Sequence, residues 1–301
     1  MKITTTKQIA LIIAVVAVTV GAVVLVVDNM RKSARIKMEC LELVNSPVYN
    51  SVSAIHGVVD REGGAIFEFT IKRPGLFDGY LLIKQIEPRL VGYELPVVIT
   101  ASGNATMIKT VRSSDATLTF EIKQSFSMLP LVGGPSAARM EYPVKGVSEV
   151  IQARGGVSGS NKITHVGGYV HAVDILANMG SIVVAGKSGT VVSAVSSYPD
   201  LGCGLKELAP RSNTVAILHD DGSEAVYAHL MQDSVRVAEG QKVVAGEAIA
   251  KVGNSGSAIA PHLHFYVGGL TASDYKSLPV EFSGCGKKDF WVPELRSYSC
   301  D

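Results

Sequence analysis

Hydrophobic and polar residues follow two different patterns along this chain. Residues 9–27, IALIIAVVAVTVGAVVLVV, are apolar and uncharged throughout. From about residue 38 onward, apolar residues come in short alternating or β-branched runs, separated by turns rich in glycine, proline, asparagine and aspartate. Alternation with a period of two indicates strands that bury one face, and helix signals are scarce in this part. The pattern therefore predicts a mainly β protein behind one long apolar segment.

The apolar run 9–27 is long enough to anchor the chain in a membrane. A helix rises about 1.5 Å per residue, so this run would cross most of a hydrocarbon core of about 30 Å. A cleaved signal peptide is the alternative, but the run exceeds the usual apolar region and no clear small-x-small site follows it. We expect residues 1–37 to form a cytoplasmic stub and an uncleaved transmembrane anchor. The orientation stays open because positive charge flanks both sides, at Lys2, Lys7, Arg31, Lys32, Arg35 and Lys37.

The remaining chain divides into two predicted β-rich parts. Residues 38–140 carry the runs AIFEFTIKR, YLLIKQI, LPVVITA and ATLTFEIKQ, which predict a small antiparallel accessory domain of the sandwich type. The stretch LVGGPSAARMEYPVKG resembles a connection, and residues 141–301 then form a second antiparallel domain with a C-terminal extension. Within it, SIVVAGKSGTVVSAV and TVAILHDDGSEAVYAHL are each typical of a strand–turn–strand unit.

Charge and cysteines narrow the function classes. The net charge of +1, without a basic stripe carrying aromatic residues, argues against a nucleic-acid partner. The four cysteines form no C-x-x-C pair, which argues against a structural zinc finger. Outside the cytoplasm disulfides become permitted. Cys285 and Cys300 would then close a short loop, with Cys40 and Cys203 as a speculative second pair.

Histidines are concentrated late in the chain. Six of the seven lie between residues 165 and 264. In APHLHFY, His262 and His264 are two positions apart, so in a strand they would project from the same face. A catalytic zinc site needs three protein ligands and an open position, and further imidazoles can move protons beside it. His219 precedes the Asp-Asp-Gly turn, and we expect it at an exposed strand end.

Four stretches together resemble one family. They are GTVVSAV, HDDGSEAVYAHL, VRVAEGQKVVAGEAIAKVGNSG and PHLHF, and they span about Gly155 to Val267. In this order they resemble the lysostaphin-like (LytM-type) zinc endopeptidases, which cut peptidoglycan peptides. The resemblance implies one Zn²⁺ per chain, with Asp174 and His264 as ligands. It also implies that His229, in YAHL, and His262 are catalytic residues that do not bind the metal.

The first histidine ligand departs from the commonest pattern of that family. The usual H-x-G-x-D spacing fails here because position 170 is Val170. His171 lies three residues before Asp174, which in a regular strand puts it on the opposite face unless a bulge intervenes. His165, in ITHVGGYVHAVDI, resembles a branch of the family with a longer spacing. We therefore expect His165 to be the ligand and keep His171 as the alternative.

The resemblance implies a membrane-anchored zinc metalloendopeptidase that hydrolyses peptide bonds in peptidoglycan stems or cross-links. Its domain would lie in the periplasm, held to the inner membrane by one span, with cell-wall machinery proteins as further partners. The alternative is a non-catalytic relative that binds cell wall or activates cell-wall amidases, as some family members do after losing zinc ligands. Intact YAHL and HLHF motifs favour the enzyme. A third alternative, a lipoyl-like barrel, is disfavoured because it would leave the histidines unexplained.

Overall fold

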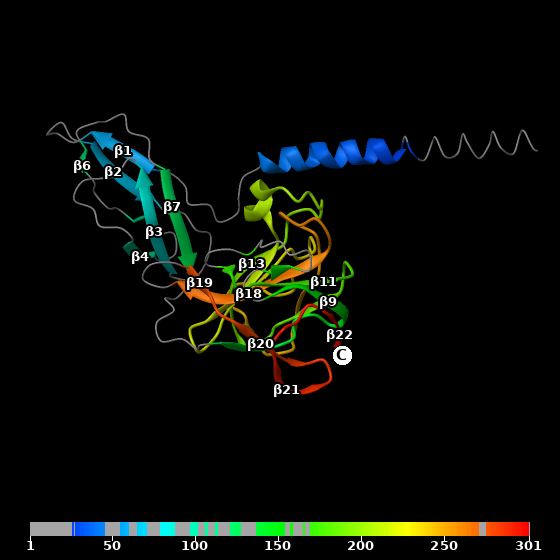
Figure 1. Ribbon diagram of the computed structural model, residues 1–301. Helices are drawn as coiled ribbons and strands as arrows, with labels where there is room; N and C mark the ends of the chain where they lie inside the picture. Colours follow the sequence, from blue (N-terminus) through cyan, green and yellow to red (C-terminus); the bar gives the residue numbers. More distant parts are fainter. Residues whose placement is uncertain are drawn as a thin grey trace, which may run out of the picture. The chain divides into compact units, whose positions relative to one another are not determined.

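The computed structural model describes residues 26, 28–45, 137–153, 157–158, 165, 169–270 and 275–300, together with the strands between residues 55 and 127. The chain divides into two compact units, Met1–Pro47 and Val48–Asp301. In the first unit one helix covers residues 28–44 (Figure 1). Among the described helices, none combines the length and apolar character needed to cross a bilayer. The predicted span 9–27 lies outside the described residues except for residue 26.

Seven strands before residue 128 form two antiparallel sheets. The first sheet contains β1 (Ile55–Val59), β2 (Ala65–Thr70), β5 (Thr106–Met107) and β6 (Arg112–Ser113). The second has the order β4-β3-β7, from β3 (Gly79–Glu87), β4 (Val97–Ala101) and β7 (Glu121–Ser127). The predicted antiparallel β structure is thus confirmed. The sandwich and the domain boundary near residue 140 stay predictions.

The largest sheet has the order β10-β9-β11-β18-β15-β14-β13-β16, and neighbouring strands in this order run antiparallel. Its strands are β9 (Gly146–Ala153), β10 (Val157–Ser158), β11 (Val173–Ala177), β13 (Gly189–Val195), β14 (Thr214–Leu218), β15 (Glu224–Ala228), β16 (Lys242–Val243) and β18 (His262–Leu270). Two more strands pair with it, β19 (Tyr275–Ser277) with β18 and β22 (Ser297–Cys300) with β9. A short 3-10 helix, η2 (Lys206–Arg211), precedes β14.

Smaller sheets accompany this one, and one of them corrects the expectation that residues 181–195 form a strand–turn–strand unit. β12 (Ile182–Val184) pairs with β17 (Ala248–Lys251), while β13 pairs with β14 and β16. The run 181–195 therefore holds two strands, as its pattern indicates, but they are not paired with each other. A turn pattern shows where the chain reverses, whereas the choice of a hydrogen-bonding partner depends on distant segments. In contrast, β14 and β15 form the predicted hairpin.

Alternation along β18 separates the core from the opposite face of the sheet. Leu263, Phe265 and Val267 are fully buried in the main hydrophobic core. His262 and His264 alternate with them and so project from the other face. On the neighbouring β11, Val173 and Ile175 are likewise in the core, which leaves Asp174 on the face of the two histidines. The core thereby holds these polar residues in fixed positions.

The C-terminal extension packs onto the same core. β20 (Val280–Gly284) pairs with β21 (Lys287–Trp291) and, in parallel, with β8 (Ala138–Glu141). Trp291 and Tyr298 stack with ring centroids 4.4 Å apart, and Tyr142 stacks on Trp291. The predicted Cys285–Cys300 disulfide is confirmed and closes this extension. The pairing of Cys40 with Cys203 stays a prediction.

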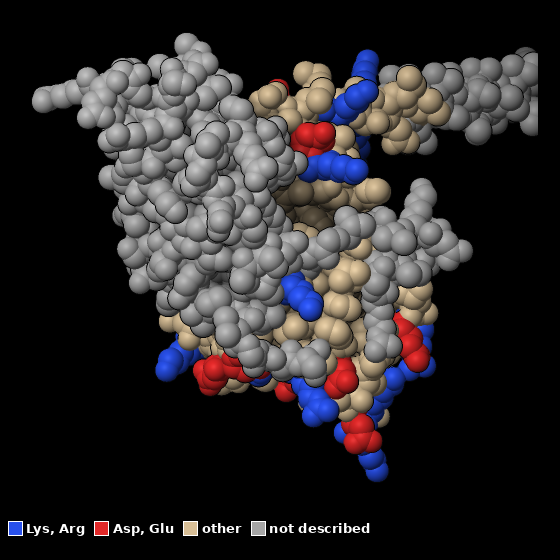
Figure 2. Space-filling model, turned by 60° about the vertical axis from the view of Figure 1, so that its left-hand side comes forward, with Lys and Arg blue, Asp and Glu red and all other residues tan. Residues whose placement is uncertain are grey.

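The described surface carries mixed charge. In the face drawn in Figure 2, Lys and Arg side chains lie among Asp and Glu side chains along the part below the grey atoms. Arg139 pairs with Glu281 at 3.1 Å and Lys187 with Asp221 at 2.5 Å. This interspersed pattern agrees with the net charge of +1 and favours no partner that needs a field of one sign.

Candidate metal centre

The centre of the site is a pair of residues on adjacent strands. β11 and β18 run antiparallel, with Asp174 directly opposite His264. The Nδ1–H of His264 donates a hydrogen bond of 2.7 Å to Oδ1 of Asp174. The two residues are 90 positions apart in the chain, so the register of the sheet alone brings them together.

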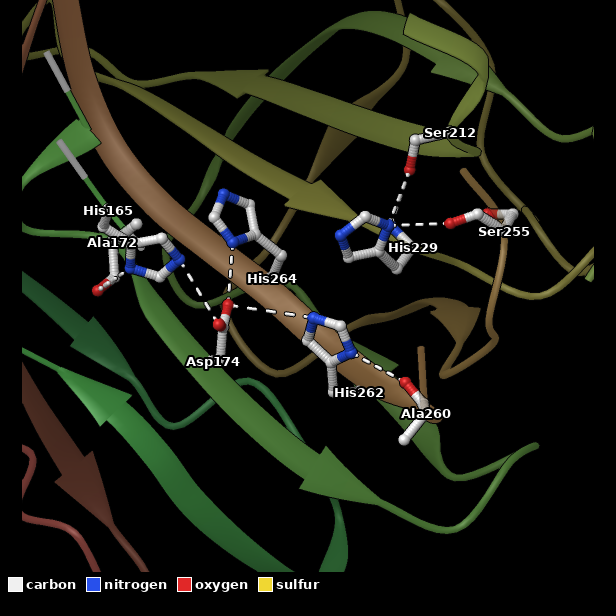
Figure 3. Close-up of polar contacts among 9 residues, drawn as sticks. All are labelled: His165, Ala172, Asp174, Ser212, His229, Ser255, Ala260, His262 and His264. Atoms are coloured by element: carbon white, nitrogen blue, oxygen red, sulfur yellow. Dashed lines mark hydrogen bonds and ion pairs between the residues drawn. The ribbon is translucent and has the colours of Figure 1, made fainter. Parts of the chain in front are cut away.

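His165 completes a group of three from a segment that precedes β11. Its Nε2 lies 3.3 Å from Oδ2 of Asp174, and its ring meets that of His264 edge to face at 4.8 Å (Figure 3). Its Nδ1 lies 3.1 Å from the carbonyl oxygen of Ala172. A carbonyl only accepts hydrogen bonds, so Nδ1 carries a proton and Nε2 faces the carboxylate.

Two further histidines lie beside this group. His262 Nδ1–H donates to the carbonyl of Ala260 at 2.8 Å, and its Nε2 lies 3.9 Å from Oδ1 of Asp174. His229, just after β15, donates from Nδ1–H to the carbonyl of Ser255 at 2.7 Å. The rings of His229 and His262 are 4.7 Å apart. When neutral, both imidazoles thus keep Nε2 as a proton acceptor on the ring edge away from these carbonyls.

Burial and neighbouring rings set the charge of the site. Burial alone would raise the pKa of Asp174, but the close contacts of its carboxylate with the imidazoles of His165 and His264 hold that pKa well below its usual range. Burial, with smaller contributions from His262 and His264, lowers the pKa of His229 to about 3. At neutral pH the site therefore combines a carboxylate with a neutral His229.

The group of His165, Asp174 and His264 suits a metal ion. One donor atom from each lies within 4.8 Å of the others, and all three side chains are at least partly buried. With Nδ1 of His165 protonated, its Nε2 and Oδ2 of Asp174 are both electron-rich and only 3.3 Å apart. A second proton on His165, or a cation bound by both atoms, would turn this repulsive contact into an attractive one. Two histidines and a carboxylate are a zinc-type donor set that leaves a fourth position open. The residues present therefore fit zinc.

The structure separates the two candidates for the first histidine. His165 lies in the group of three, whereas His171 is outside it and donates its main-chain N–H to the hydroxyl of Ser277. The ligand roles of His165, Asp174 and His264, and the catalytic roles of His229 and His262, stay predictions. The geometry nevertheless brings all five residues into one site.

The expectation for His219 is wrong. Its side chain is buried, and its Nδ1–H donates to the carbonyl of Ser188 at 2.9 Å. The Asp-Asp-Gly turn does lie beside it, but the adjacent turn of residues 187–189 covers the ring. The sequence pattern placed His219 correctly at a strand end and could not show this covering segment.

Sequence reasoning also missed a set of polar residues behind His229. They are Ser212, Asn213 and Ser255, all buried. Ser212 and Asn213 come immediately before β14, and Ser255 lies in the glycine-rich stretch before β18. The sequence does not mark them, because their burial is visible only in the structure. Buried polar groups are nearly always hydrogen-bonded to something specific.

Comparisons with known proteins agree with this site. Residues 168–274 match the model of Peptidase family M23. The chain is 30% identical over 126 residues to the murein hydrolase activator NlpD of Escherichia coli, covering 42% of this chain and 27% of that protein. It is 35% identical over 100 residues to lysostaphin of Staphylococcus staphylolyticus, covering 33% of this chain and 18% of that protein.

A solved structure, the catalytic domain of lysostaphin from Staphylococcus simulans, is 28% identical, with a TM-score of 0.29. The match covers 37% of this chain and 78% of that one. The chain spans only 27% of the length of the murein hydrolase activator and 18% of that of lysostaphin. The family match starts after His165 and includes the other four site residues. Residues 168–274 are therefore similar to peptidase family M23, in agreement with the resemblance to the lysostaphin-like peptidases.

Proposed function

We propose that this chain is a zinc metalloendopeptidase that hydrolyses peptide bonds in peptidoglycan stems or cross-links. We further propose that residues 9–27 anchor it in the inner membrane, with the catalytic domain on the periplasmic side, where peptidoglycan lies. The observation that carries the proposal is the complete group of His165, Asp174 and His264, with His229 and His262 beside it.

In this proposal His165, Asp174 and His264 hold the zinc ion. The chemistry that zinc supplies when bound is Lewis acidity, which polarises a carbonyl and lowers the pKa of water. His229 and His262 present Nε2 as acceptors, because main-chain carbonyls hold their Nδ1 protons. Each can orient a water molecule and take its proton. Once protonated, the same imidazole can stabilise the oxyanion and return the proton to the leaving amine.

The second candidate is a non-catalytic activator of cell-wall hydrolases. The similarity to a protein named murein hydrolase activator favours it. Such a role needs only a binding surface, whereas here the donor set for a metal and both neighbouring imidazoles are present together. We therefore rank hydrolysis first.

The test combines metal content with peptide release. The full chain, purified in detergent, is incubated with isolated peptidoglycan, and soluble products are identified by mass spectrometry. Zinc per chain is measured on the same samples. His165→Ala and His264→Ala remove proposed ligands, and His171→Ala is the matched control. A parallel reaction contains a cell-wall amidase, to detect activation.

For the wild type we expect about one zinc ion per chain, and peptide cleavage without added amidase. Both should be lost in His165→Ala and His264→Ala and kept in His171→Ala. The loss of cleavage should be roughly a thousandfold or more, since metal catalysis supplies several kcal/mol and each 1.36 kcal/mol is tenfold. Amidase activation without cleavage, in a protein that binds no zinc, would establish the activator instead.

A further inference from the structure

His229 has an unusual backbone for a side chain at the site. Its φ is 60°, in the left-handed region that non-glycine residues rarely adopt. The residue comes immediately after β15, where the chain leaves the sheet. A conformation of this kind persists only when surrounding contacts hold it. The contacts of His229 therefore decide where its imidazole points.

Ser212 supplies two of these contacts. Its hydroxyl oxygen accepts the main-chain N–H of His229 at 2.9 Å and lies 3.2 Å from Nδ1 of the same residue. One buried side chain thus contacts both the backbone and the ring of His229, and Figure 3 shows its contact with the ring. The remaining contact of Nδ1 is the carbonyl of Ser255 at 2.7 Å, which requires Nδ1 to be protonated.

A hydrogen-bond network holds Ser255 itself in place. Its hydroxyl accepts the main-chain N–H of Asn213 at 3.0 Å and donates to the carbonyl of Leu230 at 2.8 Å. The amide of Asn213 donates to the carbonyls of Leu230 and Tyr198. These groups are buried, so their positions are well defined. Ser212 adjoins this network through its neighbour Asn213 and extends it to the backbone of His229.

We propose that Ser212 is the positioning residue for His229: it holds the left-handed backbone and the ring so that Nε2 faces the site as a proton acceptor. The proposal deepens the peptidase function proposed above and rests on it for its effect on catalysis. The hydroxyl has no contact with the group of three and should not affect metal binding. Without it the N–H of His229 loses its acceptor, the backbone relaxes and the ring turns away from the reacting water.

The test compares Ser212→Ala with a matched serine. Ser234 is partly buried; like the hydroxyl of Ser212, its hydroxyl accepts one main-chain N–H, here from Lys251, and it donates to the carbonyl of Met231 as that of Ser212 does to the carbonyl of Asn213. Ser234→Ala thus removes the same kind of contacts away from His229. Full-length proteins with ¹⁵N-labelled histidine are examined by long-range ¹H–¹⁵N NMR, with His229 assigned from the spectrum of His229→Asn. Steady-state kinetics, zinc content and melting temperature are measured on the same samples.

In the wild type we expect one His229 form, protonated on Nδ1 and bare on Nε2. Ser212→Ala should show mixed forms of this ring and a kcat about 10- to 100-fold lower, as is typical when a supporting contact is removed. KM and zinc content should stay near wild type, and the melting temperature should match Ser234→Ala. Ser234→Ala should keep the wild-type His229 signals and kcat.

A single unchanged His229 form in Ser212→Ala would overturn the proposal, as would a kcat equal to that of Ser234→Ala. A loss of activity that only follows zinc loss or unfolding would overturn it too, because that result indicates a general structural role. If the wild type cleaves nothing, the peptidase function fails separately. The NMR comparison then still decides whether Ser212 positions His229.

Discussion

The hairpin of β14 and β15 has a histidine at each end, and the two differ in their surroundings. His219 follows β14 and His229 follows β15, so they lie at opposite ends of the sheet. Both donate Nδ1–H to a main-chain carbonyl. The Nε2 of His219 is buried without a hydrogen-bond partner among the described residues, whereas His229 faces His262 and His264. Anchoring of Nδ1 therefore does not distinguish the two imidazoles, whereas the groups around Nε2 do.

The largest expected effect is the difference in peptide cleavage between His229→Asn and His219→Asn. His229→Asn should lower peptide cleavage by about 10² to 10⁴-fold, the usual contribution of a proton-transferring group. His219→Asn should stay near wild type, because the asparagine amide can still donate to the carbonyl of Ser188. Both variants should keep their zinc. Initial rates of muropeptide release measure the effect, and equal losses in the two variants would contradict the comparison.

Glycines beside each histidine offer a second comparison, of moderate size. A Cβ at Gly189 would overlap main-chain atoms of Leu218, and one at Gly253 would overlap those of Met231. Each alanine substitution should lower the free energy of unfolding by about 1–3 kcal/mol, as overpacking does. Only Gly253→Ala should also reduce cleavage, because the N–H of Gly253 donates to the carbonyl of His229.

Denaturant unfolding and cleavage assays on both glycine variants measure the two effects. A stable, fully active Gly253→Ala would show that the end of the hairpin near His229 tolerates movement. A loss of cleavage in Gly189→Ala beyond its loss of stability would show instead that the two ends are coupled through the sheet.

The smallest expected effect is a change in pH dependence. Burial lowers the pKa of His219, with Lys187 adding to the shift, while the Ser188 carbonyl, Asp221 and Asp220 oppose it. The unfolded state then binds a proton more readily than the folded state. The contribution of His219 to the free energy of unfolding is therefore present above the pKa of the unfolded state, about 6.5, and is lost as the pH falls below that value. His219→Asn should reduce this acid sensitivity.

Unfolding midpoints in denaturant between about pH 5 and pH 8 measure this change. The reduction should be partial, because burial lowers the pKa of His229 as well, and that contribution remains. If the midpoints of wild type and His219→Asn run parallel over this range, His219 contributes nothing to the acid sensitivity.

Local patterns were sufficient wherever one strand or one hairpin decides the outcome. The two-residue spacing of His262 and His264 places them on one face of β18, and the Asp-Asp-Gly turn marks the β14–β15 hairpin. The same patterns failed for β12 and β13, which pair with other strands. They also failed for His219, whose cover comes from residues 187–189. In each failure the missing information lies in a segment distant along the chain.

The amino-acid pattern was enough to predict a mainly β chain, the faces of its strands and the residue types suited to a zinc site. The arrangement of the folded chain was needed to show that Asp174 lies opposite His264, that His165 rather than His171 joins them, and that Ser212 contacts His229. The difference arises because some features depend on neighbouring residues and others on residues distant along the chain. The direction of a side chain follows from the backbone of its own strand, whereas sheet order, register and buried hydrogen bonds depend on how remote segments share one core.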